Sequence, residues 1–462
     1  MSKVEFGADG IRYIAGEPPL DPNNAVRIGR ALGQFVCARN DHPVVIMGRD
    51  TRPSGGWLAA SLSSGLRYEG VDLVDLGIMT TPGVAFVARR QRAELGLAIS
   101  ASHNPAEFNG IKLVGPGGLR LQREEEIEIE QAVNHAISSG EAAGSRQGQE
   151  TDGEHLIELY IDEHVRRCPA PNLAKLKIVL DCANGAAARV APAVFERLQA
   201  DVQVIHSESN AIINDHCGSE HARRHPEDLL SIVRQQGAAY GLAFDGDGDR
   251  LIVIDPEGNM FDGDDILYAL AVYYHSQNLL RGSAIVTTKT ANSGLLEALA
   301  ALGISTIIAE KGDRSLEAAL WRGNFILGGE QTGNIILNDG HHTASDATFT
   351  ALVLMGAICF GSLTLRQIVA PLVKRPQVIV SLRLARSKPL AEIPQLREEI
   401  RRADKNLGPG CRIMTWYSST EPGLFRVMVE GARHGTREQV DEQAQAICRT
   451  MQETCSVILP VA

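Results

Sequence analysis

Short apolar runs alternate with amphipathic segments along most of the chain. Residues 44–47, 95–99 and 240–244 have the length of buried strands, and each run ends in a polar loop. Segments such as 22–40 and 81–89 place apolar residues near helical spacing. Strands that alternate with helices predict βαβ units, parallel sheets and functional residues at the carboxyl ends of the strands.

The pattern changes near the end of the chain. Two strand-like segments at 378–384 and 424–430 lie among predicted helices, which indicates a smaller α+β module. The apolar run at 349–363 is shorter than the ~20 residues that cross a membrane, so we expect a buried core helix. We predict an α/β fold of three doubly wound domains with mixed or parallel sheets plus a C-terminal α+β domain, bounded at residues 1–150, 151–255, 256–370 and 371–462.

The polar loop after residues 95–99 carries the first candidate chemistry. Ser102, His103 and Asn104 follow one another there, and Pro105 cannot continue a central strand. We expect a buried strand that delivers the Ser102 hydroxyl onto an exposed loop. A serine in that position is a candidate nucleophile, and an ordinary loop serine is the alternative.

Three aspartates follow the apolar run at 240–244 at a spacing of two. Asp245, Asp247 and Asp249 would repel one another in one loop unless a cation neutralised them, which favours a metal site over a solvated acidic turn. Arg250 stands where an EF-hand requires glycine, so an EF-hand is excluded. So few carboxylates, with positions left for phosphate and water, favour Mg²⁺ over Ca²⁺.

Composition narrows the class of protein. The 462 residues are 44% hydrophobic and 22% charged, which allows a large core and excludes global disorder. The net charge is −11 and no long Lys/Arg run is present, so we expect neither a nucleic-acid nor a membrane partner. The eight cysteines lack CxxC pairs, which argues against a zinc site and a disulfide framework. With no apolar signal core after Met1, a cytoplasmic protein is expected.

Hydroxyl and basic groups on other loops are weaker candidates. Arg12, Arg49 and Arg52 lie on polar loops, and single arginines there are usually solvated. Residues 418–422, with Arg426 nearby, supply hydroxyls and turn N–H groups that suit an oxyanion such as phosphate. A turn stabilised by Ser and Thr side chains explains that segment equally well.

Five stretches in chain order resemble four motifs of the α-D-phosphohexomutase superfamily, and most of all its bacterial phosphoglucosamine mutase branch. Residues 99–105, Ile-Ser-Ala-Ser-His-Asn-Pro, resemble the phosphoserine loop, and residues 245–250 resemble the metal loop. Residues 327–334, Leu-Gly-Gly-Glu-Gln-Thr-Gly-Asn, are similar to the sugar-binding loop. Residues 417–422 and 426–431 resemble the phosphate-binding loop of the last domain.

The resemblance implies a phosphosugar mutase of four domains around a central cleft, as a monomer or homodimer. It would move a phosphoryl group between the 6- and 1-positions of a hexose or hexosamine phosphate, with glucosamine phosphate favoured. Phosphorylated Ser102 would donate to a sugar hydroxyl, and the bisphosphate would return its other phosphate to Ser102. Mg²⁺ would be bound by Asp245, Asp247, Asp249 and the Ser102 phosphate. The other implied roles are catalysis by Lys112, Arg12 and His103, and substrate binding by Glu330, Thr332, Ser418, Ser419, Thr420, Arg426 and Arg250.

The loops that would select the substrate depart from the family pattern. Asn334 stands where the family usually has histidine, and Trp416 stands where it has arginine. The loss of one Arg–phosphate contact costs about 1.5–3 kcal/mol of binding. Three functions therefore stay open: a mutase for glucosamine phosphate or another phosphosugar, a divergent phosphosugar-binding or regulatory paralogue, and a phosphoserine-dependent phosphatase.

Overall fold

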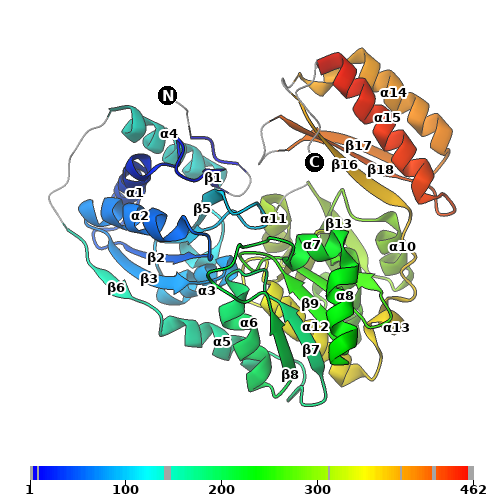
Figure 1. The fold of residues 1–462 in the computed structure, drawn as a ribbon, viewed down its shortest axis with the longest axis horizontal. Helices are drawn as coiled ribbons and strands as arrows, with labels where there is room; N and C mark the ends of the chain where they lie inside the picture. The colour runs from blue at the N-terminus through cyan, green and yellow to red at the C-terminus, as the bar shows by residue number, and fades with distance from the viewer. Residues whose placement is uncertain are drawn as a thin grey trace. The chain divides into compact units, whose positions relative to one another are not determined.

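The computed structural model describes residues 4–7, 10–139, 147–310, 313–384, 388–418 and 423–455. These residues form four separate β-sheets with helices packed around them (Figure 1). They belong to two compact units. The first is Met1–Lys289 with Ser305–Val369, and the second is Thr290–Ile304 with Ala370–Ala462.

The first sheet has the strand order β1-β5-β4-β2-β3-β6, and its helices cover both faces (Figure 1). Strands β4, β2, β3 and β6 are parallel, whereas β5 runs antiparallel to both of its neighbours, β4 and β1, so the sheet is mixed. Arg49 at the end of β2 pairs with Ile99 at the end of β4, so the loops after these strands start at one edge. The elements are β1 (Ile11–Ile14), α1 (Pro22–Cys37), β2 (Val44–Arg49), α2 (Gly55–Tyr68), β3 (Asp72–Ile78), α3 (Thr81–Gln91), β4 (Leu95–Ile99), β5 (Phe108–Val114), η1 (Pro116–Gly118), α4 (Arg123–Ser139) and β6 (Glu150–Asp152).

Strand β5 shows how this sheet positions a functional side chain. Successive side chains of a strand point to opposite faces. Ile111 therefore lies in the core beneath α1, α2 and α4, with Leu113 packed against it. Lys112 points to the other face, where it meets the carboxylates of the second sheet's main loop.

The second sheet has the strand order β11-β10-β9-β7-β8. Strands β8, β7 and β9 are parallel, and β10 returns antiparallel to β9. All residues of β9 and β10 are buried, so the connecting loop 245–250 is held at both ends by the core. The elements are α5 (Leu156–Arg166), β7 (Lys177–Asp181), α6 (Ala187–Arg197), β8 (Asp201–Ile205), α7 (Gly218–Arg224), α8 (Pro226–Gln236), β9 (Tyr240–Phe244), β10 (Leu251–Ile254) and β11 (Met260–Phe261).

The third sheet, of order β13-β12-β14-β15, completes the first unit. Helix α12 is buried from its first residue to Ala357, which confirms the core helix predicted at 349–363, although Phe360 and Leu363 are exposed. Asp346 caps this helix by accepting from Phe349 N. The elements are α9 (Gly263–Ser276), η2 (Arg281–Ser283), β12 (Ala284–Thr288), β13 (Ser305–Ala309), α11 (Asp313–Gly323), β14 (Leu327–Gly329), β15 (Ile335–Leu337), α12 (Ala347–Gly361) and α13 (Leu365–Val369).

The second unit contains an antiparallel sheet of order β16-β18-β17. Helices α14 and α15 pack on this sheet and share its apolar core. Arg412 and Ser293 both bond to the fully buried Glu430, which ties α10 to the sheet. The elements are α10 (Ser293–Ala301), β16 (Gln377–Arg383), η3 (Leu390–Glu392), α14 (Pro394–Leu407), β17 (Arg412–Tyr417), β18 (Leu424–Glu430) and α15 (Arg437–Cys455).

The predicted fold class is confirmed: three α/β regions with mixed sheets are followed by a smaller region with an antiparallel sheet. The domain limits remain predictions, and β6 and β11 reach past the expected limits at 150 and 255. Among the described residues, no helix combines the length and apolarity needed to cross a membrane. The described cysteines form no disulfide.

Candidate active site

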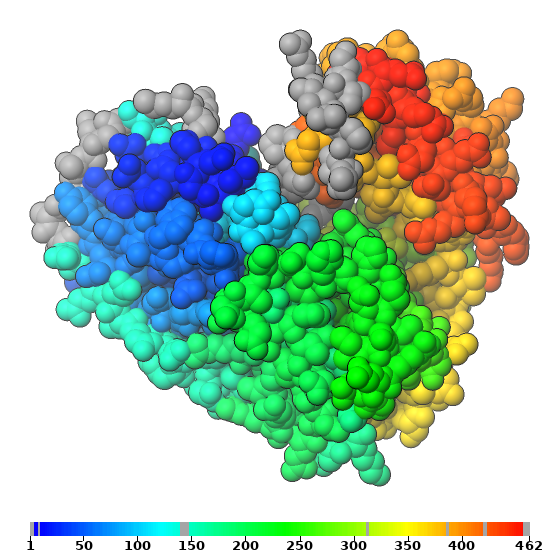
Figure 2. Space-filling model, viewed as in Figure 1, coloured from blue at the N-terminus to red at the C-terminus, as the bar shows by residue number. Residues whose placement is uncertain are grey.

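The first and second sheet regions pack directly against each other, as the blue and green surfaces show (Figure 2). Thr51 Oγ1 donates to Asn184 O across this junction, and Thr81 N donates to Asp247 O at 3.0 Å. The loop after β4 and the loop after β9 also meet here, through a hydrogen bond from Ser102 Oγ to Asp245 Oδ2, although they are far apart in the sequence. The candidate site is built where they meet.

Ser102 lies in this junction with a left-handed backbone, φ 53°. Its Oγ donates to Asp245 Oδ2 at 2.7 Å and lies 3.3 Å from His103 Nδ1. Pro105 and Glu107 of this loop are exposed as expected, but Ser102 itself is buried, with only 2% of its surface exposed. The aspartate loop covers it so closely that a Cβ on Gly246 would lie 2.7 Å from Ser102 O.

Arg52 holds the Ser102 loop in place. It is 1% exposed, so the expectation of a solvated arginine is wrong for this position. A single side chain thus fixes the turn that presents the serine, and Asn214 Nδ2 adds a second bond to Ser102 O at 2.8 Å. The Arg52 guanidinium donates to Asp50 Oδ2 and to the carbonyl oxygens of Ser102, Asn104, Pro105 and Phe108.

The three aspartates of the 245–250 loop converge as predicted. Each offers one carboxylate oxygen, and these oxygens lie within 4.8 Å of one another. Asp245 Oδ1 accepts from the backbone N–H of Asp249 at 3.0 Å, which closes the loop on itself. Lys112 Nζ donates to Asp247 Oδ2 at 2.7 Å and to Asp249 Oδ2 at 3.1 Å. All four side chains are buried, so this cluster concentrates charge where water does not screen it.

Burial and mutual repulsion separate the pKa values of these carboxyl groups. Desolvation, followed by repulsion from Asp249 and Asp247, raises the pKa of Asp245 well above its usual range. Desolvation also acts on Asp247, but its contacts with Lys112 and Thr81 outweigh it and lower the pKa to about 2. Lys112 therefore compensates the charge of Asp247, whereas the attraction of Arg250 does not offset the desolvation and repulsion that act on Asp245.

The cluster fits a divalent cation. Asp247 Oδ1 and Asp249 Oδ1 are buried and have no hydrogen-bond partner among the described residues. Unpartnered buried oxygens are costly, and a cation would satisfy them. A small cavity of about 50 Å³ borders Lys112 and Asp249. Carboxylate oxygens are the ligands that hard cations such as Mg²⁺ and Ca²⁺ prefer.

The loop 330–334 joins the aspartate loop. Leu251 N donates to Gly333 O at 3.1 Å, and Arg250 and Asn334 form a backbone bridge. Gly333 has φ 97°, and a Cβ there would lie 2.4 Å from Leu251 O, so this close approach requires glycine. Thr332 Oγ1 donates to Asn334 Oδ1 at 3.0 Å.

The start of α12 is attached to the same aspartate loop. Ser345 Oγ donates to Asp249 O at 2.7 Å, and Ala347 N donates to Gly248 O at 3.0 Å. Because α12 is buried in the core, these bonds fix the aspartate loop from behind. The first unit thus brings together Ser102, His103, Lys112, Asp245, Asp247, Asp249, Arg250, Glu330 and Thr332 around connected loops.

Comparison with known proteins identifies the family. The models for α/β/α domains I, II and III of phosphoglucomutase/phosphomannomutase match residues 3–139, 158–258 and 262–375. The chain is 38% identical to phosphoglucosamine mutase from Bacillus cereus over 427 residues, which is 92% of this chain and 94% of that protein. The chain belongs to the α-D-phosphohexomutase superfamily.

Solved structures show the same fold. A phosphoglucomutase/phosphomannomutase family protein from Burkholderia thailandensis is 23% identical, with a TM-score of 0.79 and 99% of both chains covered. N-acetylphosphoglucosamine mutase from Aspergillus fumigatus, solved with GlcNAc-6P and magnesium, is 16% identical, with a TM-score of 0.63, covering 98% of this chain and 96% of that chain. As a phosphohexomutase, the chain is a phosphosugar mutase, which is an intramolecular phosphotransferase.

The structure describes some of the remaining predicted site residues of this phosphohexomutase and leaves others out. Arg12 Nη1 donates to Asn104 Oδ1 at 3.1 Å, so Arg12 contacts the Ser102 loop. Arg426 on β18 pairs with Trp416 on β17, and Ser418 N donates to Leu424 O, all within the second unit. Ser419 and Thr420 lie outside the described residues.

Sequence reasoning did not foresee which residues position the candidate loops. Arg52 was named only as a weak candidate that is usually solvated, and Ser345 was not named, because each acts on a loop that is distant in sequence. One signal was available for Arg52. Arg52 follows the buried strand β2, which is parallel to β4, the strand before Ser102. Loops that follow neighbouring parallel strands lie at the same edge of the sheet.

Proposed function

We propose that this phosphohexomutase interconverts glucosamine-6-phosphate and glucosamine-1-phosphate through phosphorylated Ser102. The observation that carries the proposal is the buried Ser102 hydroxyl, 2.7 Å from one aspartate of a three-aspartate loop that also holds Lys112. The 38% identity with phosphoglucosamine mutases supports the choice of sugar.

The reaction is a pair of phosphoryl transfers. A sugar hydroxyl attacks the phosphorus of phosphorylated Ser102, the bond from phosphorus to Ser102 Oγ breaks, and a sugar bisphosphate forms. Its other phosphoryl group then transfers to Ser102 Oγ, and the isomerised monophosphate leaves. Positioning and electrostatic stabilisation supply most of the acceleration in such transfers. A site braced by buried hydrogen bonds suits this requirement.

Residues around Ser102 have separate roles in the proposal. Lys112 moves the proton of the attacking hydroxyl, Arg12 stabilises charge on the transferring group, and His103 orients the Ser102 oxygen. The contact of Arg12 with Asn104 and the 3.3 Å separation of His103 Nδ1 from Ser102 Oγ support the last two roles. The residues proposed to bind the substrate are Arg250, Glu330, Thr332, Ser418, Ser419, Thr420 and Arg426.

Mg²⁺ is the proposed cofactor. Asp245, Asp247, Asp249 and the phosphate on Ser102 would hold it, and the all-oxygen donor set suits this ion. Bound Mg²⁺ neutralises charge on a transferring phosphoryl group. The Aspergillus fumigatus relative with magnesium and GlcNAc-6P supports both the ion and the kind of partner, a small phosphosugar. We further propose a cytoplasmic location, in keeping with the free cysteines.

A sugar-phosphate panel tests the proposal. Glucosamine-6-phosphate, glucose-6-phosphate and mannose-6-phosphate are each assayed with the matching bisphosphate, with Mg²⁺ and after treatment with EDTA. We expect the highest kcat/KM with glucosamine-6-phosphate, loss of turnover with EDTA, and phosphate on Ser102 by mass spectrometry. Turnover without any phosphate on Ser102 would contradict the proposed intermediate.

A change of substrate is the second candidate function. Asn334 and Trp416 replace residues usual in the family, and Asn334 lies in the loop proposed to bind the sugar. Phosphate exchange onto Ser102 without isomerisation of any of the three sugars would favour this candidate or the regulatory one. Release of free phosphate without isomerisation would favour hydrolysis.

A further inference from the structure

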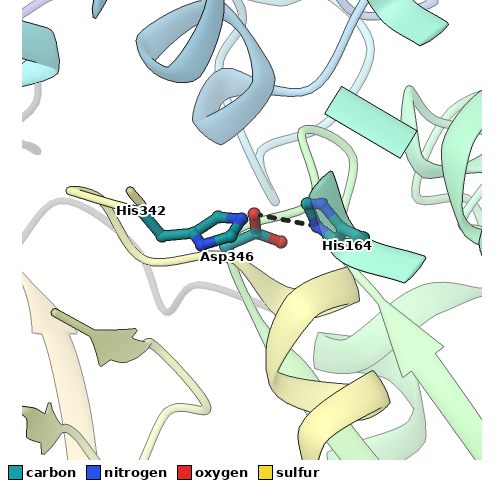
Figure 3. A group of neighbouring side chains, drawn as sticks. All are labelled: His164, His342 and Asp346. Atoms are coloured by element: carbon teal, nitrogen blue, oxygen red, sulfur yellow. Dashed lines mark ion pairs between the residues drawn. The ribbon is translucent and has the colours of Figure 1, made fainter. Parts of the chain in front are cut away.

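A second buried cluster lies on the side of the aspartate loop where α12 begins. It consists of His164 on α5, His342 in the loop before α12, and Asp346 at the cap of α12. Figure 3 shows the two imidazole rings on opposite sides of the Asp346 carboxylate, both directed toward it. The exposed fractions are 0% for His164 and 3% for each of the other two. This cluster takes no part in the phosphoryl-transfer chemistry proposed above.

Hydrogen bonds fix which nitrogen of each histidine carries the proton. His164 Nδ1 lies 2.8 Å from Tyr160 O, and a carbonyl oxygen can only accept, so Nδ1 is the donor. His342 Nδ1 lies 3.2 Å from Asp339 Oδ2, and a carboxylate likewise accepts. In the neutral rings, both Nε2 atoms therefore carry lone pairs. A histidine that binds a metal is usually oriented in this way, by a carbonyl or carboxylate on its other nitrogen.

Both Nε2 atoms lack a hydrogen-bond partner among the described residues. His164 Nε2 lies 3.2 Å from Asp346 Oδ2, but the contact does not have hydrogen-bond geometry. Two acceptors that face each other in a buried site repel unless a positive charge lies between them. That charge is either a proton on an imidazole or a metal ion.

The remaining contacts of Asp346 are those of an oriented metal ligand. Its Oδ1 accepts from Phe349 N at 2.9 Å, and its Oδ2 accepts from Tyr160 Oη at 2.6 Å. These bonds hold the carboxylate still and leave a lone pair of Oδ2 toward the histidines. Phe349 also stacks on His342 with ring centroids 3.8 Å apart, so the ring is fixed by packing.

We propose that His164, His342 and Asp346 bind a divalent transition-metal ion of the Zn²⁺ class. One ligand atom from each residue lies within 4.8 Å of the other two. The separation of 3.2 Å between His164 Nε2 and Asp346 Oδ2 is close to the distance of about 3.3 Å between two ligands of a tetrahedral ion with bonds of about 2.0–2.1 Å. Two imidazoles and one carboxylate suit Zn²⁺ and its neighbours rather than Mg²⁺. The lack of CxxC pairs argues only against a cysteine-ligated zinc site, and this site contains no cysteine.

The ion would act on structure rather than on the reacting atoms. His164 comes from the second sheet region, and Asp346 leads directly into Ala347, whose N–H donates to Gly248 O. Ser345, on the other side of Asp346, donates to Asp249 O. A metal ion between His164 and Asp346 would therefore brace the segment that supports the catalytic aspartates.

Cobalt binding tests the proposal, because Co²⁺ in a nitrogen-containing tetrahedral site absorbs strongly in the visible range. The full chain is stripped of metal, saturated with Mg²⁺ to occupy the oxygen site, and titrated with Co²⁺. We expect one equivalent to produce intense visible bands, and Zn²⁺ to abolish them. Zn²⁺ at one hundred times its Kd should raise the Tm by about 3–4 °C.

Variants separate this site from other histidines. His164→Gln and His342→Gln should each lose the bands and the Zn²⁺-dependent shift in Tm. His341→Gln is the matched control, because His341 neighbours His342 but contacts Glu163 instead of the cluster, and it should behave as the parent chain. Circular dichroism of the metal-free variants verifies that they are folded. Absence of bands in the folded parent chain, or their persistence in both cluster variants, would overturn the proposal in favour of a protonated histidine–aspartate pair.

Discussion

The loop proposed to donate the phosphoryl group and the loops proposed to bind the acceptor sugar differ in how closely they follow the family pattern. Ser102 is fixed by Arg52, Asn214 and Asp245 through buried hydrogen bonds. The acceptor loops contain two replacements of residues usual in the family, Asn334 and Trp416. A substitution in a buried hydrogen-bond network leaves other polar groups without partners, whereas a substitution of a side chain that contacts the substrate alters one contact. The proposed donor loop therefore keeps the family pattern, whereas residues 334 and 416 on the proposed acceptor side differ from it, although the backbone of loop 330–334 is also held by hydrogen bonds.

The strongest test of the donor side is Ser102→Ala. It removes the oxygen proposed to carry the phosphoryl group, so kcat should fall by ~10⁴-fold or more for every sugar phosphate. A coupled assay measures the loss, and mass spectrometry should find no phosphate on the variant. Ser64→Ala, on the exposed face of α2, is the control and should keep full activity. Full turnover in Ser102→Ala would remove the serine from the mechanism.

Lys112→Met should have the next largest effect. It leaves the carboxylates of Asp247 and Asp249 without their cationic partner, so kcat should fall by roughly 10²–10⁴-fold. Without Mg²⁺, the free energy of unfolding should fall by about 3–5 kcal/mol, because a buried ion pair loses one partner. Urea titrations with and without Mg²⁺ measure this loss.

Lys177→Met provides the control for this variant. Lys177 pairs with Asp201 at 3.7 Å on the surface, so its loss should change the free energy of unfolding by less than about 1 kcal/mol. Equal losses of unfolding free energy in the two lysine variants would show that burial of the Lys112 ion pairs does not increase their contribution to stability.

Arg52→Lys tests whether the shape of the guanidinium matters. Lysine keeps the charge beside Asp50, but it cannot donate in a planar fork to four carbonyl oxygens. We expect a loss of about 2–4 kcal/mol in the free energy of unfolding and a fall of roughly tenfold in kcat. Arg90→Lys, at an exposed position of α3, should change neither quantity, and an unchanged kcat in Arg52→Lys would contradict a positioning role.

Asn334→His and Trp416→Arg probe the acceptor side and should have the smallest effects. Each restores a side chain usual in the family, so activity on glucosamine-6-phosphate should rise by about two- to tenfold. The gain stays below the full ~1.5–3 kcal/mol of a charged hydrogen bond because the loops are adapted to the present residues. Comparison of kcat/KM across the three sugar phosphates measures the change. A fall for all three sugars would show that the present residues serve a different substrate.

Much of the fold could be predicted from the sequence because its central strands are uniformly apolar. Strands β4 and β9 are buried on both faces, and their limits were predicted to the residue. Strand β5 was missed because Asn109, Gly110 and Lys112 interrupt its apolar pattern. Helix α8 was missed because only Leu229 and Val233 of its residues are buried.

The candidate site was predictable where its chemistry is contiguous in sequence. The aspartate loop carries its ligands within five residues, so their types and spacing were sufficient. Arg52 and His164 gave no such signal, because their partners lie on loops that only the folded chain brings near. Burial of Ser102 was equally invisible, since it depends on the loop that covers it.

The bonds between the aspartate loop and the third sheet region have a consequence for motion. Asp249 O and Gly248 O accept from the start of α12, and Leu251 N donates to Gly333 O. Sliding one loop past the other would break several buried hydrogen bonds at once, so the loops move as one body on the timescale of turnover. If the first unit opens to admit a sugar, the hinge of that motion must lie outside these hydrogen-bonded loops. The spacing between the aspartate loop and the loop 330–334 is thus set before the substrate arrives.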